Sequence, residues 1–168
     1  MRKVTITVTN TKVGTAKLMS YPEKPQRKKY QVPLYKVKVS GKDKSGNNIE
    51  EDFEAIRFGI KRTKTINAHI VGLQDAQSYI LSWDNIRTVK GKAWRVYAGF
   101  FVHKGPDYPS LGRYASIGCI EICGLSGWAK FNNKIKELTN CETEEEVSSN
   151  RLAEIVYQAA IKPPLIKV

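Results

Sequence analysis

Apolar and polar residues alternate repeatedly in the first 64 residues of this 168-residue chain, and this pattern restricts the fold strongly. Val4, Ile6 and Val8 alternate with lysine and threonine, and residues 34–39 repeat the alternation. A period of two places successive side chains on opposite faces of a strand, so both segments are predicted to be strands with one buried face. A turn-forming cluster at 41–48 follows the second segment. We therefore predict a β-meander over residues 1–64.

Later segments add further strands and then helices. Apolar and β-branched runs predict strands over 65–73, 78–83 and 93–102. Apolar residues then recur at the helical steps of three and four, at Trp128, Phe131, Ile135 and Leu138. This spacing predicts a helix over about 126–139, and a capping-box pattern at Thr143 predicts a second over about 143–161. The expected fold class is β-rich α+β with two C-terminal helices.

The overall composition is that of an ordinary globular protein, with 41% hydrophobic and 26% charged residues. The length is suited to one domain spanning residues 1–168. Apolar runs fall well short of the roughly 20 residues that a membrane span needs, so we expect no membrane span. The three cysteines do not suggest a disulfide framework. If Cys119 and Cys123 share one strand, they lie about 13 Å apart, too far to be bridged.

The chain is strongly basic, with 28 Lys and Arg against 16 Asp and Glu and a net charge of +12. The excess is concentrated in the N-terminal meander. Such a field favours an anionic partner: nucleic acid, an acidic lipid surface or an anionic cell-wall polymer. Lysines that simply solvate the outer faces of strands would give the same composition, so both interpretations stay open.

The stretch from Phe100 to Gly124 combines two apolar runs with a turn-rich loop. The first run ends in His103, a loop rich in glycine and proline follows, and the second run carries Cys119. Both runs are typical of strands, so residues 93–124 are predicted to form a strand–loop–strand unit. Two such strands can bring an imidazole and a thiol within reach of each other. That arrangement is the one a cysteine nucleophile and its base require.

The same stretch resembles the catalytic signature of L,D-transpeptidase domains. That signature is a His, a loop, then Ser/Thr-His-Gly-Cys, an apolar residue and usually Asn or Arg. Here His103 and a loop precede the sequence S-I-G-C-I-E, which spans residues 116–121. Ile117 occupies the position of the second family His, and Glu121 that of the Asn or Arg. The resemblance implies a β-sandwich-like catalytic domain without a cofactor or a metal.

The resemblance also implies roles for four residues. Cys119 would be the nucleophile and His103 the base that takes its proton. The backbone carbonyl of Lys104 would orient the imidazole, and Gly118 would leave the approach to the thiol open. The substrate would be a peptidoglycan stem peptide, attacked at the carbonyl between its third and fourth residues with release of D-alanine. The acyl group then passes to an amine, as in transpeptidation, or to water, as in an L,D-carboxypeptidase.

Five further residues are candidates for substrate binding. A guanidinium at Arg113 can hold a peptide carboxylate in bidentate fashion. Tyr114 and Ser116 lie just before the nucleophile, and the Ser116 hydroxyl can hydrogen-bond His103 or the substrate. Glu121 can pair with a basic residue or select a cationic group on the substrate. His69 lies in an apolar segment and is either structural or a replacement for the missing family His. A zinc site including both histidines can be drawn, but the ligand spacing of zinc sites is absent, so we expect no metal.

The expected location follows from the substrate. The N-terminal residues alternate as in a strand, and no signal peptide is recognisable. We expect a protein made in the cytoplasm that acts in the periplasm or cell wall after secretion, either as a mature fragment or as an antibacterial effector with an immunity protein as partner. For such an enzyme we expect no nucleic-acid partner. The alternative is a non-enzymatic, basic, β-rich module that binds nucleic acid or another polyanion.

Overall fold

The computed structural model describes residues 1–21, 28–63, 67–86, 91–112 and 115–168. Three long strands form its antiparallel base: β1 (Val4–Met19), β2 (Lys29–Lys42) and β3 (Asn48–Ile56). Val8 pairs with Val37, which in turn pairs with Phe53, so apolar positions fall in register across the three strands. The alternation in the sequence therefore gives this sheet one buried face and one solvent-exposed face.

The remaining strands extend this base on both sides. They are β4 (Gly59–Lys61), β5 (His69–Val71), β6 (Gln77–Ile80), β7 (Ser82–Asn85), β8 (Lys92–Tyr97), β9 (Phe100–Lys104), β10 (Ile120–Ile122), β11 (Ala153–Tyr157) and β12 (Ile166–Lys167). Within the described ranges, the main sheet has the order β6-β11-β1-β2-β3-β10-β9-β8-β7, with β12 also on β2. The pairs β1–β11 and β9–β10 are parallel, and the other pairs are antiparallel, so this is a mixed sheet.

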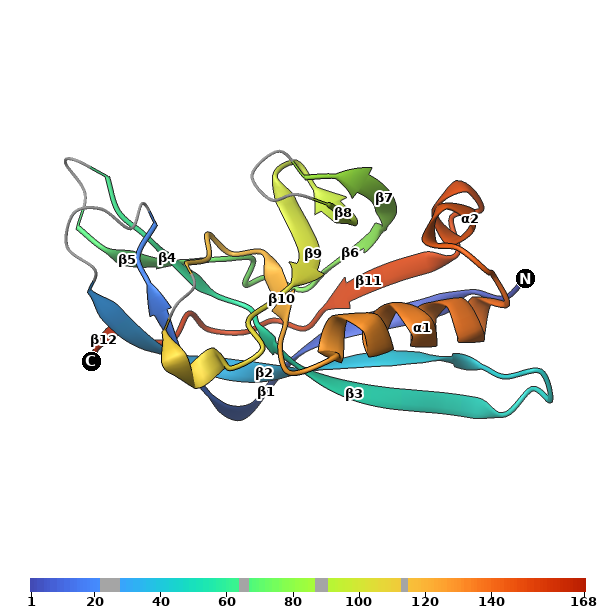
Figure 1. Ribbon diagram of the computed structural model, residues 1–168, viewed down its shortest axis with the longest axis horizontal. Helices are drawn as coiled ribbons and strands as arrows, with labels where there is room; N and C mark the ends of the chain where they lie inside the picture. The colour runs from blue at the N-terminus through green and yellow to red at the C-terminus, as the bar shows by residue number, and fades with distance from the viewer. Residues whose placement is uncertain (22–27, 64–66, 87–90, 113–114) are drawn as a thin grey trace.

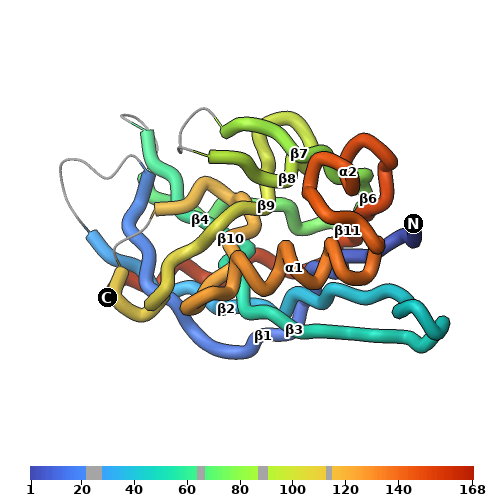
Figure 2. Tube along the Cα trace, turned by 45° about the vertical axis from the view of Figure 1, so that its right-hand side comes forward, coloured from blue at the N-terminus to red at the C-terminus, as the bar shows by residue number. Residues whose placement is uncertain are grey.

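The sheet curls around a core that includes one face of α1 (Gly127–Thr139). Figures 1 and 2 show α1 lying along the long strands, with β7, β8 and β9 on the other side of it. Phe131, Ile135 and Leu138 of α1 are buried against the sheet, as their spacing predicts. The stacked rings of Tyr79 and Tyr97, 5.4 Å apart, join β6 to β8, so strands near opposite edges meet. The β-rich α+β class is confirmed.

Several predicted elements differ in the structure. The predicted strand over 78–83 is divided at Leu81 between β6 and β7. The second helix, α2 (Glu144–Ser149), does begin with the predicted cap, since Thr143 Oγ1 accepts a hydrogen bond from the Glu146 amide at 3.1 Å. It ends far short of residue 161, because Arg151 has a positive φ of 54° and the chain then enters β11. Positions 152, 155 and 156 fit the helical period, whereas Ala153, Ile155 and Tyr157 alternate as in a strand, and these three are the buried ones. Parallel pairing with β1 favours the strand.

The predicted strand over 93–102 is a hairpin rather than one strand. β8 and β9 are antiparallel and are joined at Ala98 and Gly99, where Ala98 has a φ of 48°. A turn of two small residues inside an apolar run carries little signal in the sequence. No helix in the described part of the chain is long and apolar enough to cross a membrane.

Candidate active site

Parallel pairing of β9 with β10 places the two segments of the predicted catalytic pair side by side. Val102 is paired with Ile120, and His103 with Glu121. Residues paired across two strands point to the same face, so the side chains of Glu121 and His103 share one face, and Cys119 comes just before β10. The loop between the strands includes the short 3₁₀ helix η1 (Pro109–Leu111). The strand–loop–strand prediction thus leads to a parallel pair with a crossover loop.

The His103 ring is fixed by its own neighbour. Nδ1 lies 2.9 Å from the carbonyl oxygen of Lys104, which is the contact that the family resemblance implies. Because a carbonyl only accepts, Nδ1 carries the hydrogen and Nε2 is left as the basic nitrogen. Nε2 lies 4.0 Å from Oε1 of Glu121. Burial lowers the pKa of His103, and the Lys104 contact opposes this shift, so the resting imidazole is neutral.

The Cys119 thiol is also held in its neutral form. Its residue is 9% exposed, and Sγ contacts the carbonyl of Gly99 at 3.9 Å. Burial raises the pKa of Cys119 to about 11; the Phe101 backbone opposes the shift and Glu121 adds to it. Among the hydrogen bonds of the described residues, none joins the thiol to His103. The resting site is therefore a neutral thiol beside a neutral imidazole, not a preformed ion pair.

The turn before Cys119 packs against the β4–β5 hairpin. The Ser116 carbonyl accepts a hydrogen bond from the Ile60 amide at 2.9 Å, and Ser116 Oγ accepts one from the Gly118 amide at 3.2 Å. Gly118 has a φ of 102°, and a Cβ there would lie 2.8 Å from the Cα of Gly72. Only glycine meets both demands at position 118. A Cβ on Gly59 would overlap the Ser116 carbonyl, so two neighbouring elements fix this turn.

Glu121 is the most unusual group of the site. It is 1% exposed, and its Oε2 has no hydrogen-bond partner among the described residues. Burial raises its pKa to about 8, while the hydroxyl of Ser116 opposes the shift. Of the two roles left open for Glu121, pairing with a basic residue of the protein suits this burial better than binding a cationic group of the substrate. The structure instead directs the carboxyl group toward His103 and Ser116.

The other sequence-predicted residues have different outcomes. His69 lies in β5 with Nδ1 3.1 Å from the Asn67 carbonyl, and no hydrogen bond or ion pair of the described residues joins it to His103 or Cys119. Arg113 and Tyr114 lie outside the described residues. Within the described ranges, no group of three or more His, Cys, Asp or Glu side chains is arranged to hold a metal ion. Sequence reasoning missed Gly59 and Gly72, since an isolated glycine gives no indication of what it will face.

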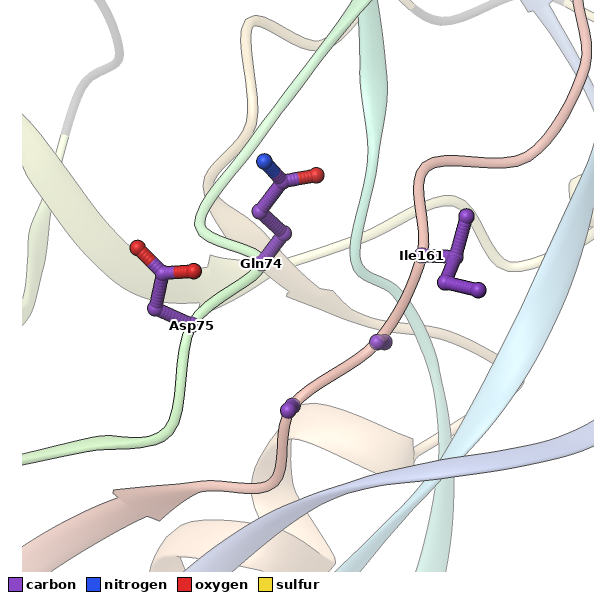
Figure 3. Close-up of a pocket in the computed structure, with 5 residues that line it drawn as sticks. Gln74, Asp75 and Ile161 are labelled. Atoms are coloured by element: carbon purple, nitrogen blue, oxygen red, sulfur yellow. The ribbon is translucent and has the colours of Figure 1, made fainter.

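A separate pocket of about 350 Å³ is lined by Gln74, Asp75, Ala159, Ala160 and Ile161. Figure 3 shows Gln74 and Asp75 on one segment and Ile161 on the C-terminal segment facing them. None of the predicted site residues lines this pocket. Asp75 is the one charged residue among those that line it, so the lining does not indicate a particular class of ligand.

Comparison with protein-family models, with curated proteins and with solved structures finds no match for this chain. The chemistry of the site must therefore be argued from its own residues. These are a thiol, an imidazole with a fixed tautomer, a buried carboxyl group and a turn of fixed conformation.

Proposed function

We propose that this protein is a cysteine-dependent acyl transferase or hydrolase that resembles L,D-transpeptidases and acts on peptidoglycan stem peptides. The observation that supports this most is the contact of His103 Nδ1 with the Lys104 carbonyl at 2.9 Å, next to the segment that carries Cys119. That contact leaves Nε2 as an acceptor that can take the proton of a thiol brought toward it. A histidine with a purely structural role at the end of a strand needs neither a fixed tautomer nor a cysteine on the neighbouring segment.

The neutral resting state determines the order of steps. Burial disfavours both a thiolate and an imidazolium, so the proton leaves Sγ as the new bond forms rather than beforehand. Substrate binding must first bring Sγ and Nε2 of His103 together. The S–H electron pair then forms the C–S bond, the proton moves to Nε2, and the leaving amine of D-alanine takes that proton. An amine or water next attacks the thioester and releases Cys119.

The proposed substrate also sets the proposed location and partners. We propose action in the periplasm or cell wall after secretion, as an antibacterial effector neutralised by an immunity protein. A net charge of +12 suits contact with an anionic cell-wall polymer. The fold within the α+β class is proposed to be the β-sandwich-like fold of the L,D-transpeptidases.

The basic binding module is the less favoured alternative. Two lysines of the β2 face, Lys36 and Lys38, lie 3.8 Å from carboxylates of Asp52 and Glu50 on β3. These cross-strand pairs interrupt the positive charge on that face of the meander. A polyanion-binding surface needs a continuous run of basic groups.

Incubation with purified tetrapeptide muropeptides, followed by mass spectrometry, tests the proposal. Loss of D-alanine, or a crosslinked product, is expected from the wild type and from Cys123→Ser, but not from Cys119→Ser. Cys123 is the matched control because it is also a buried thiol near Glu121. Among the two histidines, His103→Ala is expected to abolish turnover and His69→Ala to preserve it. Equal activity of both cysteine variants would refute the thiol mechanism.

A further inference from the structure

Glu121 combines features that its place in the fold does not by itself explain. It lies two residues after Cys119 and directly opposite His103 across the parallel pair β9–β10. One carboxyl oxygen is 4.0 Å from His103 Nε2, and the other has no hydrogen-bond partner among the described residues. A buried carboxyl group without a full set of partners destabilises the fold. A group retained at such a cost indicates a role in the site.

Among the described residues, Glu121 forms its one ion pair with His103. On the other flank, β3 places the apolar Ile56 opposite it. Two basic side chains of the flanking segments contact other groups: Lys104 lies 4.0 Å from Asp107, and the Arg57 guanidinium donates to backbone carbonyls. Within the described part of the chain, the other polar or titratable groups that interact with it are those of Ser116, Cys119 and Cys123. A negative charge on Glu121 is therefore felt chiefly by the imidazole and by two thiols.

We propose that Glu121 is a positioning residue whose ionisation sets the strength of His103 as the base for Cys119. The inference rests on the proposed function, in which Nε2 takes the thiol proton. When Glu121 is protonated, the imidazole is a weak base in a buried site. When Glu121 is ionised, its charge stabilises the imidazolium that forms as the thiol loses its proton.

The charge of ionised Glu121 has two effects on the transfer. It attracts the imidazolium across 4.0 Å, and it raises the pKa of the Cys119 thiol. In the proposed step no free thiolate accumulates, because the S–H electron pair enters the bond to the carbonyl carbon as the proton leaves. The imidazolium persists until the leaving amine takes its proton, so the attraction dominates and ionised Glu121 promotes the transfer.

Protons and electrons balance in this step without another reactant. The thiol proton moves from Sγ to Nε2, and the S–H electron pair becomes the new bond to the substrate carbonyl carbon. The carbonyl π electrons move to oxygen and return as the leaving amine departs with the proton from Nε2. Glu121 remains a carboxylate throughout and forms no bond. Since burial raises the pKa of Glu121 to about 8, activity is expected to increase as the pH passes through that region.

Nuclear magnetic resonance of the two histidines tests the pair without any assay of activity. The ring signals of His103 are expected to show an inflection near pH 8 as Glu121 ionises 4.0 Å away. This inflection should vanish in Glu121→Gln, a nearly isosteric change, while His69 serves as the internal reference. Absence of the inflection in the wild type, or its persistence in Glu121→Gln, would overturn the inference whether or not the protein is active.

Turnover of tetrapeptide muropeptides provides the second readout. In the wild type, kcat/KM should increase by roughly tenfold or more across the region near pH 8, because a charge this close changes the basicity of its partner markedly. Glu121→Gln should lack that increase, and Glu121→Asp should restore part of it. A wild-type profile that is flat near pH 8 would overturn the proposal that Glu121 sets the basicity of His103. If turnover is absent altogether but the inflection is present, the proposed function is wrong, while the electrostatic coupling of Glu121 and His103 is confirmed.

Discussion

Replacing Gly59 by alanine tests whether the β4 strand positions the nucleophile. A Cβ at this position would overlap the Ser116 carbonyl and lie 2.8 Å from the Gly118 amide nitrogen. Both neighbours are backbone, so they cannot rotate away as a side chain could. Either β4 or the turn must shift, and the turn leads directly into Cys119. The variant therefore connects a packing contact to the chemistry of the site.

Two local costs set the expected magnitude. Overpacking in a well-packed interior costs about 1–3 kcal/mol. Separation of the two segments also breaks the hydrogen bond from the Ile60 amide to the Ser116 carbonyl, 2.9 Å long, which contributes about 0.5–1.5 kcal/mol. We expect Gly59→Ala to lower the free energy of unfolding by roughly 2–4 kcal/mol. A displacement of Cys119 by about 1 Å is expected to reduce turnover by about 100-fold.

Urea unfolding followed by tryptophan fluorescence measures the first effect, and kcat/KM on muropeptides measures the second. Gly127→Ala is the matched control, because its Cβ would meet the Ile122 side chain at an ordinary 3.7 Å. Gly127 begins α1, where alanine is favoured over glycine by up to about 1 kcal/mol. If Gly59→Ala unfolds within about 0.5 kcal/mol of the wild type and keeps its activity, β4 does not hold the turn.

Three further predictions concern burial. The pKa of Glu121 is about 8 in the fold against an ordinary 4.5, so its ionisation destabilises the fold progressively above pH 4.5. In urea unfolding, the free energy of unfolding of Glu121→Gln should therefore equal that of the wild type at pH 4. At pH 8 and above it should be larger by about a few kcal/mol, the order of magnitude that the pKa shift sets. Asn132→Ala should cost about 1–3 kcal/mol, because it leaves the buried Trp94 Nε1 donor unpaired, whereas exposed Asn133→Ala should change little in the same titration. Alkylation of Cys119 by iodoacetamide, followed by peptide mapping, should be slow at pH 7 and accelerate toward pH 11; rapid reaction at pH 7 would contradict the buried, neutral thiol.

The local sequence was sufficient to predict a strand or a helix where one hydrophobic period dominated a long segment. Val4, Ile6 and Val8 can bury themselves together only in a strand, and the structure pairs that strand as the alternation predicts. The apolar stripe of residues 128–138 similarly determined α1. The candidate pair also came from sequence, because His103 and Cys119 are chemically distinctive residues within a recognisable pattern. These predictions depend on neighbours a few positions apart, which a linear sequence displays directly.

Only the tertiary structure decided how these segments meet. Residues 153–157 became β11 because β1 offered a parallel edge, although the apolar residues at 152, 155, 156 and 159 also fit a helix. The environment of Glu121 comes from β3 and β9, which are distant in sequence, together with the adjoining Ser116 turn, so neither its burial nor its approach to His103 could be predicted. Gly59 and Gly72 matter through backbones that approach them from elsewhere in the chain. Burial, charge and close packing depend on distances in space, and residue spacing alone does not determine those distances.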